Sequence, residues 1–211
     1  MERRERTEEK VQELFHAPAA GDEGTDPEFM QILQNYIFGD VCYTGSLDNR
    51  MRELVTITVL AAVQALPQLK AHLGACLHVG CTPVEAVYQC APFLGFPRTL
   101  NAIAVLNEVL TEQGITLPLP RQGTLTSEQE RYEKGSALQP PACGDALRER
   151  CARLPGGFAQ AVPRFLTELS GDFATRSGLD GRTRELLTVV LLAALGGAAA
   201  QLKDHVRGAL A

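Results

Sequence analysis

The chain has 211 residues, a formal net charge of −5 and 45% hydrophobic residues. This is the balance of an ordinary globular protein of one or two domains. The acidic charge gives no basic surface for nucleic acid, and no apolar run reaches the roughly 20 residues that span a bilayer. The charged start, MERRERTEEK, is followed by no apolar segment, so we expect no secretory signal and a cytoplasmic protein.

Helical spacing of apolar residues dominates the first part of the chain. Proline and aspartate begin several of these segments and glycine ends them, as helix caps do. The helices predicted there are 5–15, 27–38, 49–65, 67–80, 83–94 and 98–113. Residues Thr82 to Glu85 have the pattern of a capping box at the start of the helix 83–94.

The later part of the chain is also helical in its pattern. Residues 114–126 contain two prolines and no helical period, which predicts a linker. Helices are expected after it at 127–134, 145–153, 158–173, 181–195 and 198–211. Since no segment shows sustained strand alternation, the predicted fold class is all-α.

Part of the sequence occurs twice. The motif LDNRMREL at 47–54 returns as LDGRTREL at 179–186, and QLKAH at 68–72 returns as QLKDH at 201–205. Such matching over separated blocks predicts a tandem repeat. The first copy is assigned to 1–113, the linker to 114–126 and the second copy to 127–211. The second copy is expected to be incomplete, because it stops at Ala211, six residues after His205.

The first copy holds a fixed order of motifs: R-E-L, an apolar helix, Q-L-K-x-H, G-C-T-P-x-E and F-L-G-F-P-R-x-x-N-A. This order resembles the carboxymuconolactone decarboxylase family, which also contains the alkylhydroperoxidase-D-like proteins. The resemblance covers the first copy from Leu47 to about Leu110 and only the front half of the second. It implies an all-α, alkylhydroperoxidase-D-like helical bundle, rings of subunits, and a conserved Glu and His at Glu53 and His72.

Two departures from the family pattern concern the site. The peroxidase branch has a C-x-x-C pair just upstream of its His, where this chain has Ala65 and Gln68, and Ala198 and Gln201 in the second copy. The departure argues against peroxidase chemistry. Phe93 stands where relatives often have Tyr.

Glu53 and His72 can form a proton-handling pair or a structural ion pair. Their recurrence as Glu185 and His205 favours a special role and indicates a possible second site. An ideal hairpin that turns near Leu66 would place Glu53 about 20 Å along one arm and His72 about 9 Å along the other. The two would then meet only if the helices cross steeply, the first helix ends early, or a partner comes from elsewhere.

Neighbouring side chains complete the predicted site. Lys70 or Arg52 would hold a substrate carboxylate, and Gln68 would line the same pocket. Cys76 lies one turn beyond His72 and could be a thiol activated by imidazole, although a small buried residue is the simpler interpretation. The six scattered cysteines are expected to be reduced and buried, and their spacing fits no strong zinc pattern, so no metal is predicted.

If the chain is an enzyme of this family, its substrate is a small carboxylated lactone or a related anionic ring compound. His72 would protonate carbon after loss of carbon dioxide, Glu53 would orient it, and the scheme needs no cofactor. One alternative is a thiol-dependent peroxidase that uses Cys76, and another is a non-catalytic oligomeric binding protein. A homo-oligomer is expected, most simply a trimer that mimics a hexameric ring, with no nucleic acid or membrane partner.

The two copies are not expected to be equivalent. The helix 83–94 and the turn 95–97 follow His72 in the first copy and would exclude water from it. No such elements follow His205, so His205 is predicted to be more exposed and the first copy to hold the working site.

Overall fold

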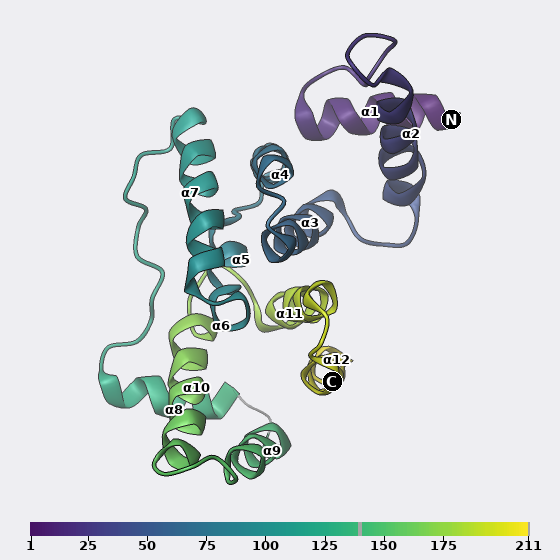
Figure 1. Ribbon diagram of the computed structural model, residues 1–211. Helices are drawn as coiled ribbons and strands as arrows, with labels where there is room; N and C mark the ends of the chain where they lie inside the picture. Colours follow the sequence, from purple (N-terminus) through teal and green to yellow (C-terminus); the bar gives the residue numbers. More distant parts are fainter. Residues whose placement is uncertain (139–140, 211) are drawn as a thin grey trace.

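The computed structural model describes residues 1–138 and 141–210, and the predicted end of the second copy at Ala211 lies outside them. All regular elements of this described part are helices, which confirms the all-α prediction (Figure 1). None of its helices has both the length and the apolar character needed to cross a membrane.

The helices of residues 1–113, called the first half below, follow the predicted order. They are α1 Arg3–Phe15, α2 Pro27–Gln34, α3 Asn49–Val63, α4 Leu66–His78, α5 Val84–Tyr88, α6 Ala91–Leu94 and α7 Phe96–Glu112. A π-helical turn, η1 Asn35–Asp40, and a short 3-10 turn, η2 Val41–Tyr43, follow α2. The irregular segment 114–126 then leads into the second half, residues 127–211.

The second half begins with two helices that both pack against a longer one. Its helices are α8 Glu128–Leu138, α9 Pro141–Cys151, α10 Phe158–Ala174, α11 Gly181–Leu195 and α12 Ala199–Leu210. α3 with α4, and α11 with α12, form two helical hairpins, and α3 packs directly against α11 (Figure 1). The contact between these two central helices joins the halves.

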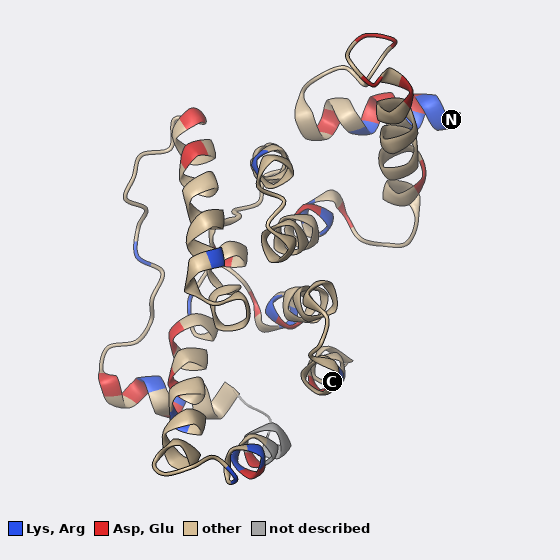
Figure 2. Cartoon of the chain, in the orientation of Figure 1, with Lys and Arg blue, Asp and Glu red and all other residues tan. Residues whose placement is uncertain are grey.

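One hydrophobic core runs through both halves. Its fully buried members include Ile57 and Leu69 from the first hairpin and Leu187 and Leu191 from α11. α3 and α11 carry charged residues only in their first turns, and the rest of each helix is uncharged (Figure 2). This distribution lets the two helices bury their length against each other while the charged turns stay at one end.

The sequence predicts that Gly39 ends a helix, but in the structure it does not. The chain continues past it in the π-helical turn, and η1 packs closely on α1. A Cβ atom at Gly39 would lie 2.6 Å from the hydroxyl oxygen of Thr7, so only glycine permits this approach. The same device recurs between α8 and α10, where a Cβ atom at Gly171 would lie 2.1 Å from the carbonyl oxygen of Arg131.

The sequence predicts one continuous helix at 83–94, and this prediction is wrong. The segment forms two short helices, α5 and α6, and α5 begins without a side-chain cap. The Glu85 carboxylate, predicted to close a capping box with Thr82, instead binds the guanidinium of Arg176 in the second half. A charged partner outweighs a local cap here, because hydrogen bonds between charged groups are the stronger ones.

Candidate active site

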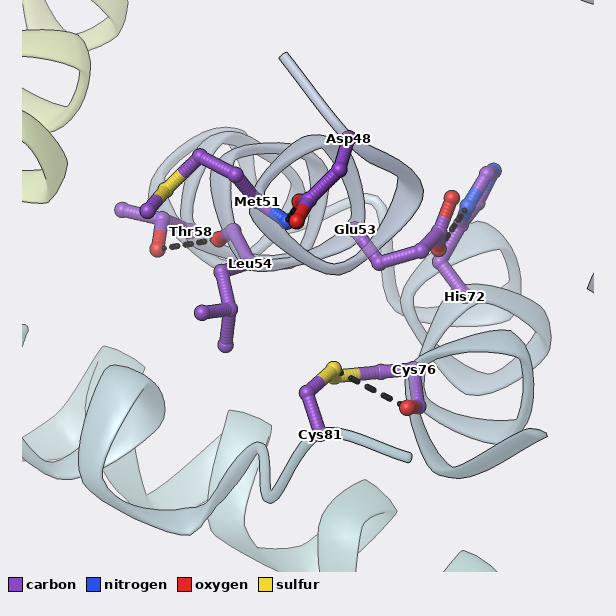
Figure 3. Close-up of a disulfide and its surroundings, with 8 residues drawn as sticks. All are labelled: Asp48, Met51, Glu53, Leu54, Thr58, His72, Cys76 and Cys81. Atoms are coloured by element: carbon purple, nitrogen blue, oxygen red, sulfur yellow. Dashed lines mark hydrogen bonds and ion pairs between the residues drawn. A yellow bond between two sulfur atoms is a disulfide. The ribbon is translucent and has the colours of Figure 1, made fainter. Parts of the chain in front are cut away.

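The α3–α4 hairpin brings Glu53 and His72 together. The Asp48 carboxylate accepts a hydrogen bond of 2.8 Å from the Met51 backbone N–H and so fixes the start of α3. Gln64, in the left-handed region at φ 59°, ends α3 two residues before the predicted end. His72 Nδ1 then lies 2.8 Å from Glu53 Oε2 (Figure 3).

One of the conditions that the sequence left open for this contact is met in the structure. Counted from the observed helix ends, Glu53 lies about 15 Å from Val63 and His72 about 9 Å from Leu66. The early end of α3, which was one of the conditions for contact, removes most of the expected mismatch. The length of the glutamate side chain covers what remains.

The surroundings of the pair determine which nitrogen of His72 can react. The Glu53 side chain is only 4% exposed and that of His72 is 18% exposed. Nδ1–H donates to the carboxylate, whereas Nε2 has no hydrogen-bond partner within the described residues. The Phe15 ring of α1 lies edge-on to the imidazole, with centroids 5.3 Å apart. A buried carboxylate thus fixes the ring and leaves Nε2 to exchange a proton with a ligand.

A second pair has the same internal geometry. His205 Nδ1 lies 2.8 Å from Glu185 Oε2, and the Asp180 carboxylate caps α11 as Asp48 caps α3. The two side chains are 31% and 38% exposed, so this pair is more open to solvent, in the direction expected for His205.

One residue of the segment predicted to shield the first pair contacts the second pair instead. Phe93 on α6 lies edge-on to His205, with centroids 5.9 Å apart. His72 receives its aromatic neighbour from α1, namely Phe15, which no sequence motif indicated. The segment 83–94 was expected to shield His72. The two halves pack through α3 on α11 and α6 on α10, and this packing places α6 beside the second half.

Two of the three predicted substrate-binding residues, Lys70 and Arg52, make contacts away from His72. Lys70 forms ion pairs with Glu108 and Glu112 on α7, at 3.4 and 2.7 Å. Two residues correspond to about 200° around a helix, so Lys70 and His72 lie on nearly opposite faces of α4. Arg52 donates to the backbone carbonyls of Leu47, Val41 and Thr44 and so supports the segment before α3. Gln68 is exposed one turn before His72 and shares its face.

Cys76 is buried, as expected, but it is not a free thiol. It forms a disulfide with Cys81, because the turn after α4 returns the chain until the two Cα atoms are 5.4 Å apart (Figure 3). The expectation of six reduced cysteines is wrong for these two. The disulfide links the last part of α4 to the turn that precedes α5, and Cys76 lies one helical turn after His72.

Two further features of the described residues concern metal ions and cavities. Nowhere among residues 1–138 and 141–210 do three or more His, Cys, Asp or Glu gather in a way that could hold a metal ion. A cavity of about 470 Å³ lies among α8, α9 and α10, lined in part by Tyr132, Pro163 and Arg164. Its lining includes no member of either Glu–His pair.

Comparison with known proteins places these elements in a family. The model of the carboxymuconolactone decarboxylase family matches residues 27–108 and 160–211, which together are more than half of the chain. The chain belongs to the carboxymuconolactone decarboxylase family. A 4-carboxymuconolactone decarboxylase of Acinetobacter baylyi is 31% identical over 91 residues, which are 42% of this chain and 68% of that protein.

The two matched segments contain both Glu–His pairs. The segment 27–108 includes α3 and α4, and the segment 160–211 includes α11 and α12. Between the family segments lie the end of α7, the irregular segment 114–126, α8 and α9. The Phe15 ring beside His72 also lies outside the matched residues, whereas Phe93 lies within them.

Proposed function

We propose that the protein is a carboxymuconolactone decarboxylase-like enzyme. Its substrate would be a small carboxylated lactone or a related anionic ring compound. The observation that carries the proposal is the buried Glu53 carboxylate, which holds Nδ1 of His72 at 2.8 Å, while Nε2 has no partner among the residues that the structure describes. The relative from Acinetobacter baylyi, a 4-carboxymuconolactone decarboxylase, supports the same reaction class.

The proposed chemistry balances without a further reactant. The bond between the carboxylate and the ring breaks, carbon dioxide leaves, and the electron pair remains as a dienolate conjugated with the lactone carbonyl. Protonated His72 donates from Nε2 to a ring carbon and recovers its proton from water. Glu53 stabilises the charged imidazole and keeps the ring oriented.

The substrate carboxylate needs a binding partner other than Lys70 and Arg52, the two cations that the sequence suggests. Lys70 and Arg52 are both engaged away from the pair. Gln68 remains the proposed polar contact, because it is exposed and lies on the face of α4 that carries His72. An amide can donate to a carboxylate without adding charge to the site.

The test is a turnover screen of carboxylated lactones and organic hydroperoxides with the wild type and His72→Ala. General acids contribute about 10²–10⁴-fold to rate, so His72→Ala should lose lactone turnover by that factor. His78→Gln is the control, since His78 Nδ1 binds the Leu14 carbonyl oxygen and contacts neither pair. Lactone turnover that is absent in the wild type, or unchanged in His72→Ala, would contradict the proposal.

A thiol-dependent oxidoreductase is the second candidate, and the Cys76–Cys81 disulfide favours it. A dithiol at these positions could reduce a hydroperoxide to an alcohol and water while forming the disulfide, and an external thiol would then restore it. The side chains are only 0% and 5% exposed, which restricts access and ranks this function below the first. Hydroperoxide turnover that is lost in Cys76→Ala would reverse the ranking.

We further propose that the two halves are tandem copies joined by residues 114–126. The support extends beyond the sequence motifs, since Arg3 pairs with Asp40 at 2.6 Å and Arg131 pairs with Asp172 at 2.6 Å. Asp40 and Asp172 each follow a glycine, Gly39 and Gly171, so the two ion pairs involve equivalent Gly-Asp dipeptides.

A homo-oligomer, a trimer or a hexamer, is also proposed. Phe29 and Ile32 of α2 and Tyr36 of the adjoining turn η1 are 64%, 62% and 60% exposed. Large apolar side chains gathered on one short segment favour burial against another subunit. A monomeric mass by light scattering at micromolar concentration would contradict the assembly.

A further inference from the structure

We infer that Phe93, Glu185 and His205 form a second acid–base site built from both halves of the chain, and that Glu85 is its positioning residue. Phe93 belongs to α6 of the first half, whereas the Glu–His pair belongs to α11 and α12 of the second. The ring stands edge-on to the imidazole at 5.9 Å, as Phe15 does to His72 at 5.3 Å. Each imidazole thus has one carboxylate and one aromatic neighbour.

An ion cluster of Glu85, Arg176 and Arg184, called the Glu85 cluster, connects α5 to the second half. The Glu85 carboxylate accepts three hydrogen bonds of 2.9 to 3.2 Å from Nε and Nη2 of Arg176. Its Oε2 also lies 3.6 Å from Nη2 of Arg184. A Cβ atom at Gly178 would lie 3.0 Å from Cγ of Glu85, so the segment before α11 can pass this close only as glycine.

Burial makes the carboxylate of Glu85 necessary for the cluster. Glu85 is 4% and Arg184 is 7% exposed. Burial lowers the pKa of the Arg184 guanidinium, and the charge of Glu85 opposes this shift. Arg184 also donates to the carbonyl oxygen of Arg176 at 2.7 Å and to Oε1 of Gln89 at 3.4 Å, but both acceptors are neutral. Nε of Arg184 is buried without a hydrogen-bond partner in the described part of the chain, so the guanidinium depends mainly on Glu85 for a compensating charge.

The sequence positions of these residues connect the cluster to the pair. Arg184 holds α5 and the next residue, Glu185, holds His205, so both contacts arise from the first turn of α11. α5 is followed at once by α6, which carries Phe93. On one side, Glu85 is connected to Phe93 by the short helices α5 and α6. On the other side, Arg184 is adjacent to Glu185, which binds His205. The contact of Glu85 with Arg184 therefore positions Phe93 relative to His205.

The first site is built differently. Arg52 occupies the position equivalent to Arg184, but it binds backbone carbonyls of its own half. Phe15 reaches His72 from α1, which packs on α4 within the first half. Loss of the contact between halves should therefore change the surroundings of His205 and leave those of His72 unchanged.

The role of this site in proton transfer rests on the proposed function, but its geometry can be tested without turnover. The chain has four histidines, so ¹⁵N-histidine labelling gives a simple imidazole spectrum at one fixed pH. His72→Gln and His205→Gln assign the two signals. The variants to measure are Phe93→Leu, which removes the ring, and Glu85→Gln, which removes the charge that holds α5.

Both variants are expected to shift the His205 signals and to leave the His72 signals in place. Arg176→Lys, which keeps the charge but loses the paired hydrogen bonds, should give a smaller shift in the same direction. Leu110→Ala is the control for general destabilisation, because Leu110 is buried in the core on α7, and it should not move His205 selectively.

Unchanged His205 signals in Phe93→Leu would overturn the composite site. A shift in Phe93→Leu without one in folded Glu85→Gln would overturn the positioning role of Glu85. If Glu85→Gln does not fold, Arg176→Lys decides that role by the same criterion. A failure of the lactone screen alone would leave these spectra unaffected, so the two proposals fail separately.

Discussion

The difference in burial between the two Glu–His pairs predicts unequal costs for removing their histidines. His72→Ala leaves the Glu53 carboxylate, 4% exposed, without its partner. His205→Ala leaves the Glu185 carboxylate, 38% exposed, in contact with water. Each variant also loses one edge-on phenylalanine contact, so that contribution is common to both.

The magnitude follows from the two environments. Breaking a buried ion pair by removing one partner costs about 3–5 kcal/mol, whereas an exposed pair is worth about 0–1 kcal/mol. His72→Ala is therefore expected to lose about 3 kcal/mol more free energy of unfolding than His205→Ala. For a chain of this size, that difference corresponds to a melting temperature lower by roughly 6–12 °C.

Urea unfolding followed by circular dichroism measures the difference. A single transition is expected because one core includes residues of both halves. Glu53→Leu combined with His72→Ala should recover much of the loss, since no unpaired buried carboxylate remains. Equal losses for the two histidine variants, or a double variant less stable than His72→Ala, would refute the reasoning from burial.

Three further predictions concern cysteines and a helix cap. The double variant Cys76→Ala, Cys81→Ala should have a free energy of unfolding lower by about 2 kcal/mol, the value expected for a disulfide that closes so short a loop. The intact mass of the wild-type protein should be two hydrogens lower than the mass of its reduced form. Asp180→Ala should cost about 1 kcal/mol at neutral pH. Hydrogen bonds from the Thr183 backbone and hydroxyl lower the pKa of Asp180, so this contribution is present above about pH 4 and lost as pH falls through the lowered value; equal variant and wild-type stability at pH 7 would contradict it. Burial raises the pKa of Cys90 to about 12, so its thiol should react with an aromatic disulfide reagent at pH 8 only after unfolding in urea.

Local patterns in the sequence predicted most of the helices and the pairing candidates. Asp48 marked the start of α3, and the recurrence of Glu and His singled out both pairs. The displacement of Lys70 could also have been found, because its position two residues before His72 places it on another face of the helix. Its acidic partners, Glu108 and Glu112, come from α7 and could not be identified from this spacing.

Contacts between distant parts of the chain could not be predicted in this way. Glu85 fits a capping box, yet its partner Arg176 is 91 residues away, and a local pattern carries no information on it. The position of Phe93 against His205 likewise depends on how α3 packs on α11. The disulfide needed the exact path of the turn after α4, since a spacing of five residues alone does not bring two sulfurs together.

The shared core also constrains how the protein is made. Ile57 and Leu187 lie in the same cluster although about 130 residues separate them in the chain. At 5–20 residues per second, a ribosome needs roughly 7–26 s to synthesise that separation. During this interval the first hairpin has formed but its α11 partner does not yet exist, so the face of α3 that meets α11 is open to chaperones and to other nascent chains.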